Sequence, residues 1–238
     1  MLSSAYDADF FDWWVALNTD PVSEDGWLAH IDRQVRQIGF DCFAYSHRRP
    51  VPFSQSDHSI IGSYPQMWIA HYNQQCYGES DPSIATARQT GLAVWAEHSD
   101  FNDCVIFNEA RACGLNIGAT FMMRGLDHST HVLGVARAEE AVCAADHLSL
   151  RLKLRCITEW LERQQPPRPA CAYAAIDLSR RETEILKWIA DGKCSNSIAE
   201  IVGLSENTVN FHVKNLQRKF GSGNRISAAA YAAALGLI

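Results

Sequence analysis

The sequence predicts two regions of different fold class. The first is an α/β sandwich over residues 1–163, with a largely antiparallel sheet flanked by helices. The second is an all-α four-helix domain with a helix-turn-helix over residues 176–238. Strand-like and helix-like segments alternate in the first region, whereas only helical patterns occur in the second. The stretch between them, QQPPRPACAYAA (164–175), is rich in proline, which resists helix interiors and sheets, so it predicts a linker.

Apolar periodicity predicts the elements of the first region. Segments 10–17 and 27–38 fit helices, the second with Trp27, Ile31 and Val35 on one side. Segments rich in β-branched and aromatic residues and bounded by turn residues predict strands; they are 40–46, 58–64, 119–125 and 131–138. Further helices are expected between these strands, at about 65–75, 81–88 and 101–112.

A last helix of the first region is predicted at about 143–163. It carries an apolar stripe with spacings of 4, 3 and 4 residues, formed by Leu150, Leu154, Ile157 and Leu161. The stripe fits packing on the sheet and fits packing on the same helix of a second chain equally well, because four positions do not establish a coiled coil.

The second region begins with a capping box, in which Ser179 precedes Glu182 by three residues. Gly192 and Gly203 are expected to end the first two helices. Ser205 is the expected N-cap of a third helix, whose inward face is predicted to consist of Val209, Val213, Leu216 and Phe220. A fourth helix follows from 224. A short helix, a tight glycine turn and a longer helix form a helix-turn-helix.

The exposed face of the third helix and its surroundings predicts DNA contacts. Asn can pair with adenine and Lys with guanine in the major groove, and nearby cations suit phosphates. The candidates are Lys193, Asn207, Thr208, Asn210, Lys214, Asn215, Arg218, Lys219 and Arg225. The alternative is an ordinary solvated helix face. Residues 176–238 hold eight Lys/Arg against six Asp/Glu, and the rest of the chain holds 13 against 21. Such a weak positive charge favours a dimer that reads two half-sites.

Composition excludes several classes. No stretch approaches eighteen uncharged apolar residues, which predicts no membrane span. The N-terminus carries three Asp and no Lys or Arg before residue 14, so it does not resemble a secretory signal. The eight cysteines form no C-x-x-C pair, and we interpret them as reduced, mostly buried thiols of a cytoplasmic protein without a metal site.

The stretch YPQMWIAHYNQQCYGESDP (64–82) raises a functional question. Tyr64, Trp68 and Tyr72 stand four residues apart, so a helix would place them on one face, and Asp81 follows. Such a set is either a wall of the core or a small-molecule site with hydrogen-bonding groups. Asp81-Pro82 also fits a plain helix N-cap followed by Pro at N1.

The C-terminal stretch LSRRETEILKWIADGKCSNSIAEIVGLSENTVNFHVKNLQRKF closely resembles the DNA-binding domain of LuxR-type transcription factors. Its matching residues are Glu182, Leu186, Gly192, Ile198, Ala199, Thr208, Val209, His212 and Leu216. The first region resembles the autoinducer-binding domain of the same family, through Trp68, Tyr72, Asp81, Pro82, Trp95 and Gly118. The resemblance covers nearly the whole chain.

This resemblance implies that the chain binds an N-acyl-homoserine lactone. Trp68 would then donate to the lactone carbonyl, Tyr72 to the amide carbonyl, and Asp81 would accept the amide N–H. Trp95 would pack against the lactone ring, and Tyr64 would add a hydroxyl or more wall. Candidate liners of the acyl tail are Ala44, Ile60, Ile69, Ile84, Phe107 and Val132. Gly134 is a departure, because many family members place Ser or Thr there; Gly118 is expected to serve close backbone packing.

The implied function is a bacterial, cytoplasmic regulator that binds the lactone, forms a homodimer and binds a palindromic double-stranded DNA site. It would act with RNA polymerase as an activator, or repress where the site overlaps a promoter, and it would need no cofactor. A regulator of another small amide or plant-derived signal is one alternative. An amidase or lactonase using Cys76 or Cys104 with His71 or His98 is another, but no G-x-S-x-G or H-x-H-x-D motif supports it.

Overall fold

The computed structural model describes residues 4–19, 26–53, 60–125, 127–138, 147–164 and 176–238. These residues fall into two compact units. Described residues of 1–48, 57–125 and 130–165 form the first, and those of 49–56, 126–129 and 166–238 form the second. Among the described helices, none combines the length and the apolar character that crossing a bilayer requires.

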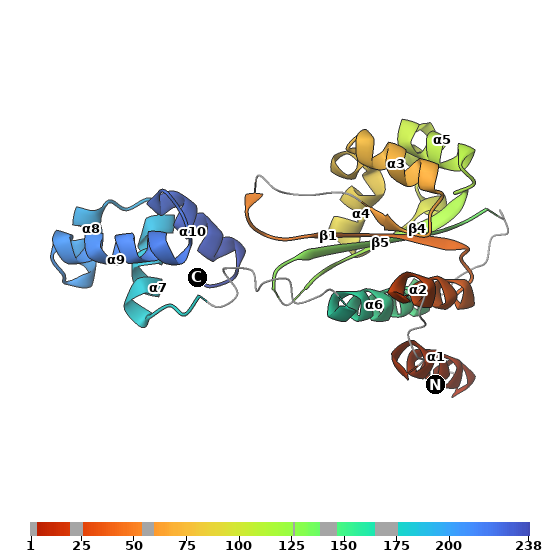
Figure 1. Cartoon of the computed structure of the whole chain (residues 1–238), viewed down its shortest axis with the longest axis horizontal. Helices are drawn as coiled ribbons and strands as arrows, with labels where there is room; N and C mark the ends of the chain where they lie inside the picture. Colours follow the sequence, from red (N-terminus) through yellow and green to blue (C-terminus); the bar gives the residue numbers. More distant parts are fainter. Residues whose placement is uncertain (1–3, 20–25, 54–59, 126, 139–146, 165–175) are drawn as a thin grey trace. The chain divides into compact units, whose positions relative to one another are not determined.

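A five-stranded antiparallel sheet is the centre of the first unit (Figure 1). Its order is β2-β1-β5-β4-β3. The strands are β1 (Cys42–Arg48), β2 (Ile61–Gly62), β3 (Leu92–Val94), β4 (Ile117–Arg124) and β5 (Thr130–Arg137). The register places Ala44 opposite Gly134 and Gly134 opposite Thr120, so residues of β1, β5 and β4 form rows across the sheet.

Helices α2 (Gly26–Gln37) and α6 (His147–Gln164) cover one face of the sheet, with α1 (Ser4–Thr19) beside α6 (Figure 1). The stripe predicted on the last helix lies within the core of this single chain. Leu150 is 6% exposed and Leu154, Ile157 and Leu161 are fully buried, in one cluster with Phe43, Leu133 and Val135. The stripe therefore packs inside the unit and not on a second chain.

Helices α3 (Gln66–Gln74), α4 (Pro82–Thr90) and α5 (Val105–Ala112) cover the opposite face (Figure 1). They enclose a second core cluster, in which Tyr64, Trp68 and Tyr72 pack with Ile106 and Leu115. The predicted sandwich is thus confirmed: helices flank both faces of an antiparallel sheet.

The second unit holds the four predicted helices, α7 (Arg180–Ala190), α8 (Ser195–Val202), α9 (Glu206–Lys219) and α10 (Arg225–Ala234). Both halves of the capping box form at Ser179 and Glu182. Gly192 has φ 80° and Gly203 has φ 66°, left-handed values that end α7 and α8 as predicted. The Ser205 side chain caps α9. The predicted inward face of α9 is buried: Val209, Val213, Leu216 and Phe220.

Two local predictions were wrong, and one strand was not predicted. Segment 58–64 was expected to be a strand, but only Ile61–Gly62 forms one, and 58–59 lie outside the described residues. The strand ends because the backbone N–H groups of Ser63 and Tyr64 both donate to the Phe43 carbonyl, which turns the chain away from the sheet. The helix expected at 101–112 begins at Val105, because Cys104 is extended and a 3-10 turn covers Ser99–Asp103. Strand β3 was missed.

Two further expectations need correction. None of the described cysteines is fully buried, and Cys76 and Cys194 are exposed; Cys143 and Cys171 lie outside the described residues. Burial is nevertheless enough to raise the pKa of Cys42 to about 12. The proposed linker overlaps α6 by one residue, because that helix extends to Gln164; the rest of the linker lies outside the described residues.

Candidate functional site

A cavity of about 550 Å³ lies in the first unit between the sheet and helices α3, α4 and α5. Eleven of the twelve residues that the sequence predicted for a ligand site line it: Ala44, Ile60, Tyr64, Trp68, Tyr72, Asp81, Ile84, Trp95, Phe107, Val132 and Gly134. Ile69 does not line the cavity; it packs against the neighbouring core cluster. The structure thus brings the aromatic stretch and the carboxylate to one place.

Trp68 and Tyr72 stand about one helical turn apart on α3, so both face the cavity from the same side of this helix. Tyr64 lies just before the helix, whose N-cap is Pro65, and lines the cavity from there. Tyr64, Trp68 and Tyr72 are 5%, 3% and 5% exposed. The rings of Trp68 and Tyr72 meet edge to face, with centroids 5.7 Å apart. These side chains are therefore core and cavity wall together: their ring faces pack while their polar tips reach the cavity.

Asp81 is held by hydrogen bonds at both carboxylate oxygens. Oδ1 accepts from the Ser83 backbone N–H at 2.8 Å and from the Ser83 hydroxyl at 2.7 Å, and Oδ2 accepts from the Tyr72 hydroxyl at 2.9 Å. The side chain is also the N-cap of α4, with Pro82 at N1, so the local role considered from the sequence is real. Burial raises the pKa of Asp81, and the hydrogen bonds from Ser83 and Tyr72 oppose that rise.

This arrangement changes the role expected for Tyr72. Its hydroxyl proton is already donated to Asp81, so in this geometry Tyr72 orients the carboxylate and is not a free donor for a ligand carbonyl. Burial, together with the nearby Asp81 charge and hydrogen bond, raises the pKa of Tyr72 and keeps the phenol protonated.

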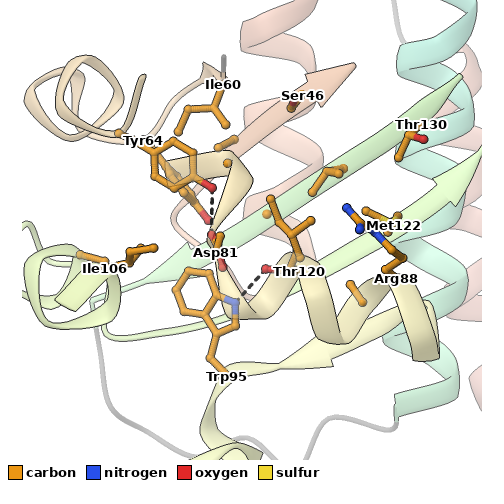
Figure 2. A pocket seen from close by; sticks show the side chains of 18 of the residues that line it. Ser46, Ile60, Tyr64, Asp81, Arg88, Trp95, Ile106, Thr120, Met122 and Thr130 are labelled. Carbon is orange, nitrogen blue, oxygen red and sulfur yellow. Dashed lines mark hydrogen bonds between the residues drawn. The ribbon is translucent and has the colours of Figure 1, made fainter. Parts of the chain in front are cut away.

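A chain of hydroxyl groups connects Trp95 to Asp81. The Trp95 indole N–H donates to the Thr120 hydroxyl at 2.9 Å (Figure 2). The Thr120 hydroxyl donates to the Ser83 hydroxyl at 2.8 Å. Ser83 in turn donates to Asp81. Thr120 and Ser83 were missed in the sequence, because isolated small polar residues carry no pattern. The Trp95 ring also meets Phe107 edge to face at 5.1 Å.

The Tyr64 side chain brings an uncommitted hydroxyl to the site. Its Oη is buried and has no hydrogen-bond partner among the described residues. A Cβ added at Gly134 would stand 2.9 Å from this oxygen. The absence of a side chain at 134 therefore leaves the space that the Tyr64 hydroxyl uses, in place of the Ser or Thr expected there from the family pattern.

Gly118 serves close packing, as predicted. A Cβ at this position would stand 2.4 Å from the Val135 carbonyl oxygen and 2.6 Å from the Trp95 ring. The glycine thereby allows the Trp95 ring to lie close against β4 at the cavity edge.

The candidate DNA-binding residues of the second unit differ in their exposure to solvent. Lys193, Asn207, Asn210, Lys214 and Arg218 are exposed, and Thr208 and Asn215 are half-buried. Phe211, which the sequence reasoning did not select, is 61% exposed on α9. Such an apolar ring on the outer face suits contact with a thymine methyl group.

Two of the candidate cations, Lys219 and Arg225, are engaged within the fold. Lys219 donates to Glu182 Oε2 at 2.9 Å and to the Asp177 carbonyl at 2.7 Å. The Arg225 guanidinium donates to the Ser195 hydroxyl and to the Lys193 carbonyl. These two cations join the ends of the helices, so their first role is to hold α8 and α9 in place.

The Glu182–Lys219 pair predicts a pH dependence of stability. Burial disfavours the Glu182 carboxylate, but hydrogen bonds from Lys219 and Ser179 outweigh this, and its pKa lies below the ordinary 4.5. The pair therefore stabilises the folded state above pH 4.5, and this stabilisation is lost as the pH falls through the lowered pKa. Glu182→Gln is expected to lower stability at pH 7 and to flatten its fall toward pH 3, as measured by calorimetry of the full chain.

Glu184→Gln is the matched control, because Glu184 lies on the same helix in an exposed pair with Arg181. Its stability and pH dependence are expected to match those of the unsubstituted protein. Equal pH profiles for Glu182→Gln and the unsubstituted protein would contradict the assignment.

Two families match consecutive parts of the chain. Residues 23–164 match the family described as "Autoinducer binding domain", and residues 177–232 match "Bacterial regulatory proteins, luxR family". The HTH-type quorum-sensing regulator RhlR of Pseudomonas aeruginosa is 40% identical, over 98% of this chain and 99% of RhlR. Regulatory protein SdiA of Escherichia coli is 31% identical, with the same coverage. The solved structure of SdiA in complex with octanoyl-rac-glycerol is similar at a TM-score of 0.75 and 28% identity, covering 100% of this chain and 98% of that chain.

Proposed function

Because this chain belongs to the LuxR family of bacterial regulatory proteins, we propose that it binds an N-acyl-homoserine lactone in the cavity of the first unit and then binds promoter DNA through α9. Family membership, which the sequence predicted, makes the chain a ligand-responsive quorum-sensing regulator of transcription and not an enzyme. The nature of the signal, the dimer and the DNA site are the proposed parts.

The observation that carries the ligand proposal is the complementarity of two buried groups. Asp81 Oδ2 accepts one hydrogen bond from Tyr72 and has a second lone pair for a ligand amide N–H. The Tyr64 hydroxyl lacks a partner among the described residues and can donate to an amide carbonyl. Trp68, whose indole can only donate, suits the lactone carbonyl. An amide next to a lactone thus gives a partner to the Tyr64 hydroxyl, and the three contacts pair the ligand's amide N–H and both of its carbonyls.

Binding of the signal is proposed to act by stabilising the folded state of the protein. A signal that fills the cavity adds apolar burial, worth about 25 cal/mol per Å², and stabilises the folded state by mass action. We assign residues 1–163 to signal binding, 176–238 to DNA binding and 164–175 to the linker. The liganded chain would form a homodimer in the bacterial cytoplasm, bind a palindromic double-stranded DNA site and act with RNA polymerase. Because the α6 stripe is buried, a dimer would have to use another surface.

A gel-shift titration of the full chain tests this function. DNA carrying a palindromic site, selected from a random pool with the liganded protein, is titrated with and without acyl-homoserine lactones of several chain lengths. At least one lactone is expected to raise DNA affinity. DNA affinity that no lactone changes would contradict signal gating.

Lys214→Ala is expected to weaken binding to all DNA sequences and to lower the salt dependence of binding, because the substitution removes an exposed cation that is proposed to contact a phosphate.

The structure of SdiA with octanoyl-rac-glycerol supports a second candidate signal, an acyl glycerol. Such a ligand has an ester in place of the amide, so Asp81 would accept from a glycerol hydroxyl. Competition between octanoyl-homoserine lactone and octanoyl glycerol on the full chain decides between them, and tighter binding of the glycerol ester would replace the lactone proposal.

The substitution Tyr64→Phe tests the proposed hydrogen bond from the Tyr64 hydroxyl to the amide carbonyl of the ligand. Tyr64→Phe is expected to weaken lactone affinity between about twofold and tenfold, the equivalent of one neutral hydrogen bond. The ligand-free protein is expected to be no less stable, because the lost hydroxyl has no partner. Affinity is measured by isothermal titration and stability by thermal unfolding.

Gly134→Ala provides the companion test. Its Cβ would crowd the Tyr64 hydroxyl, so it is expected to weaken lactone binding in the unsubstituted protein and to matter less in the Tyr64→Phe background. Fully additive effects of the two substitutions would show that Tyr64 and Gly134 act independently and would contradict this account.

A further inference from the structure

The cavity has two ends of opposite charge. The register aligns three successive rows across strands β1, β5 and β4: Ala44–Gly134–Thr120, Ser46–Val132–Met122 and Arg48–Thr130–Arg124. All nine of these residues line the cavity. The first row lies beside Tyr64 and Trp95. The third row lies four residues further along each strand, which is about 13 Å at the usual rise of a strand.

Helix α4 runs along the cavity from the side of the first row toward the side of the third row. Asp81, Ile84 and Arg88 all line it and repeat at the helical period. From Asp81 to Arg88 a helix rises about 10 Å. Figure 2 shows Arg88, Met122 and Thr130 on one side of the cavity and Tyr64, Asp81 and Trp95 on the other. The strand register and the helix rise therefore both place Arg88 at the same end of the cavity as Arg48 and Arg124.

The three arginines make this end cationic. Among the described residues, none of the three has an ion pair, and Asp81 at the other end is the one acidic residue that lines the cavity. Arg88 and Arg124 are exposed and Arg48 is half-buried, so this end reaches solvent. The hydroxyl of Thr130 lies in the same row.

We propose that the signal of this protein carries an anionic oxygen group, a carboxylate, at the far end of its acyl chain, bound by Arg48, Arg88 and Arg124. This inference rests on the proposed function, because it assumes that the amide head lies at Asp81 and Tyr64. A guanidinium forms charge-assisted, bidentate hydrogen bonds with a carboxylate. A methyl terminus at the same place would partly desolvate three cations without offering them an acceptor.

The test compares two acyl-homoserine lactones of equal chain length on the full-length protein. One ends in a methyl group and the other in a carboxylate, and their dissociation constants are measured by isothermal titration. The carboxylate is expected to bind about tenfold more tightly, since several partly exposed charge pairs act together. This preference is expected to shrink as salt rises from 0.05 M to about 0.5 M, because exposed pairs are screened.

Variants assign the preference to the arginines. The double variant Arg48→Gln/Arg124→Gln is expected to lower the ratio of the two dissociation constants to near one. The control Arg33→Gln removes an exposed arginine of α2, on the other face of the sheet, and is expected to leave the ratio unchanged (Figure 1). Thermal unfolding without ligand verifies that all variants are folded.

The outcomes separate this inference from the function on which it rests. A methyl-ended lactone that binds as tightly as its carboxylate counterpart, or a preference that the double variant retains, overturns the inference and leaves the proposed function standing. If neither lactone binds, both are overturned.

Discussion

Replacing Asp81 with alanine is expected to weaken binding of an acyl-homoserine lactone roughly a hundredfold, or by about 3 kcal/mol. The carboxylate accepts from Tyr72 and twice from Ser83, and it is proposed to accept the ligand amide N–H. Its loss leaves the ligand N–H and the Tyr72 hydroxyl buried without an acceptor. Isothermal titration of the full-length protein measures the effect.

Asp81→Asn separates the roles of this residue. Asparagine is also a good N-cap, so the start of α4 is expected to be preserved, while one of the two acceptor oxygens is replaced by a donor. Its affinity is expected to lie between those of Asp81→Ala and the unsubstituted protein. Normal lactone affinity in a folded Asp81→Ala variant would contradict the proposed head-group geometry.

Gly118→Ala is expected to lower the free energy of unfolding of the first unit by about 3 kcal/mol. The added Cβ would stand 2.4 Å from the Val135 carbonyl oxygen and 2.6 Å from the Trp95 ring. The carbonyl belongs to the central strand β5 and cannot move without breaking the sheet, so Trp95 and both strands must shift. Six of the seven tryptophans lie before residue 164, so fluorescence during urea unfolding follows this unit.

Gly223→Ala is the matched control for this substitution. A Cβ at Gly223 would meet nothing within 4 Å, and its effect is expected to stay within about 0.5 kcal/mol. If the two substitutions have equal effects on stability, the close packing of Gly118 has no energetic consequence and the prediction is wrong.

Much of the fold was predictable because apolar periodicity over eight or more residues selects a helix or a strand. The α6 stripe and the buried face of α9 are examples. Strand β3 was not predicted, because its three residues, Leu92–Val94, are too few to show an alternation of apolar and polar side chains. The partner of the α6 stripe was also beyond the sequence, since a periodic apolar face does not reveal what covers it.

The site was predictable where several residues share one pattern. The spacing of Tyr64, Trp68 and Tyr72 identified the cavity wall. Thr120 and Ser83 depend on pairing between a strand and a helix that are distant in sequence, which no local pattern reports. Arg48 was missed because the predicted strand ended at residue 46, whereas β1 extends to Arg48 and places it in alternation with Ala44 and Ser46.

The rows across the sheet have a consequence for how such receptors diverge. Each row meets a bound molecule at its own depth, and each side chain belongs to one row. A larger residue at Ser46 or Val132 would shorten the tail that the cavity accommodates, while the head contacts proposed for Asp81 and Tyr64 would stay unchanged. Populations that use signals of different length could therefore separate their communication by a single codon change in the middle row.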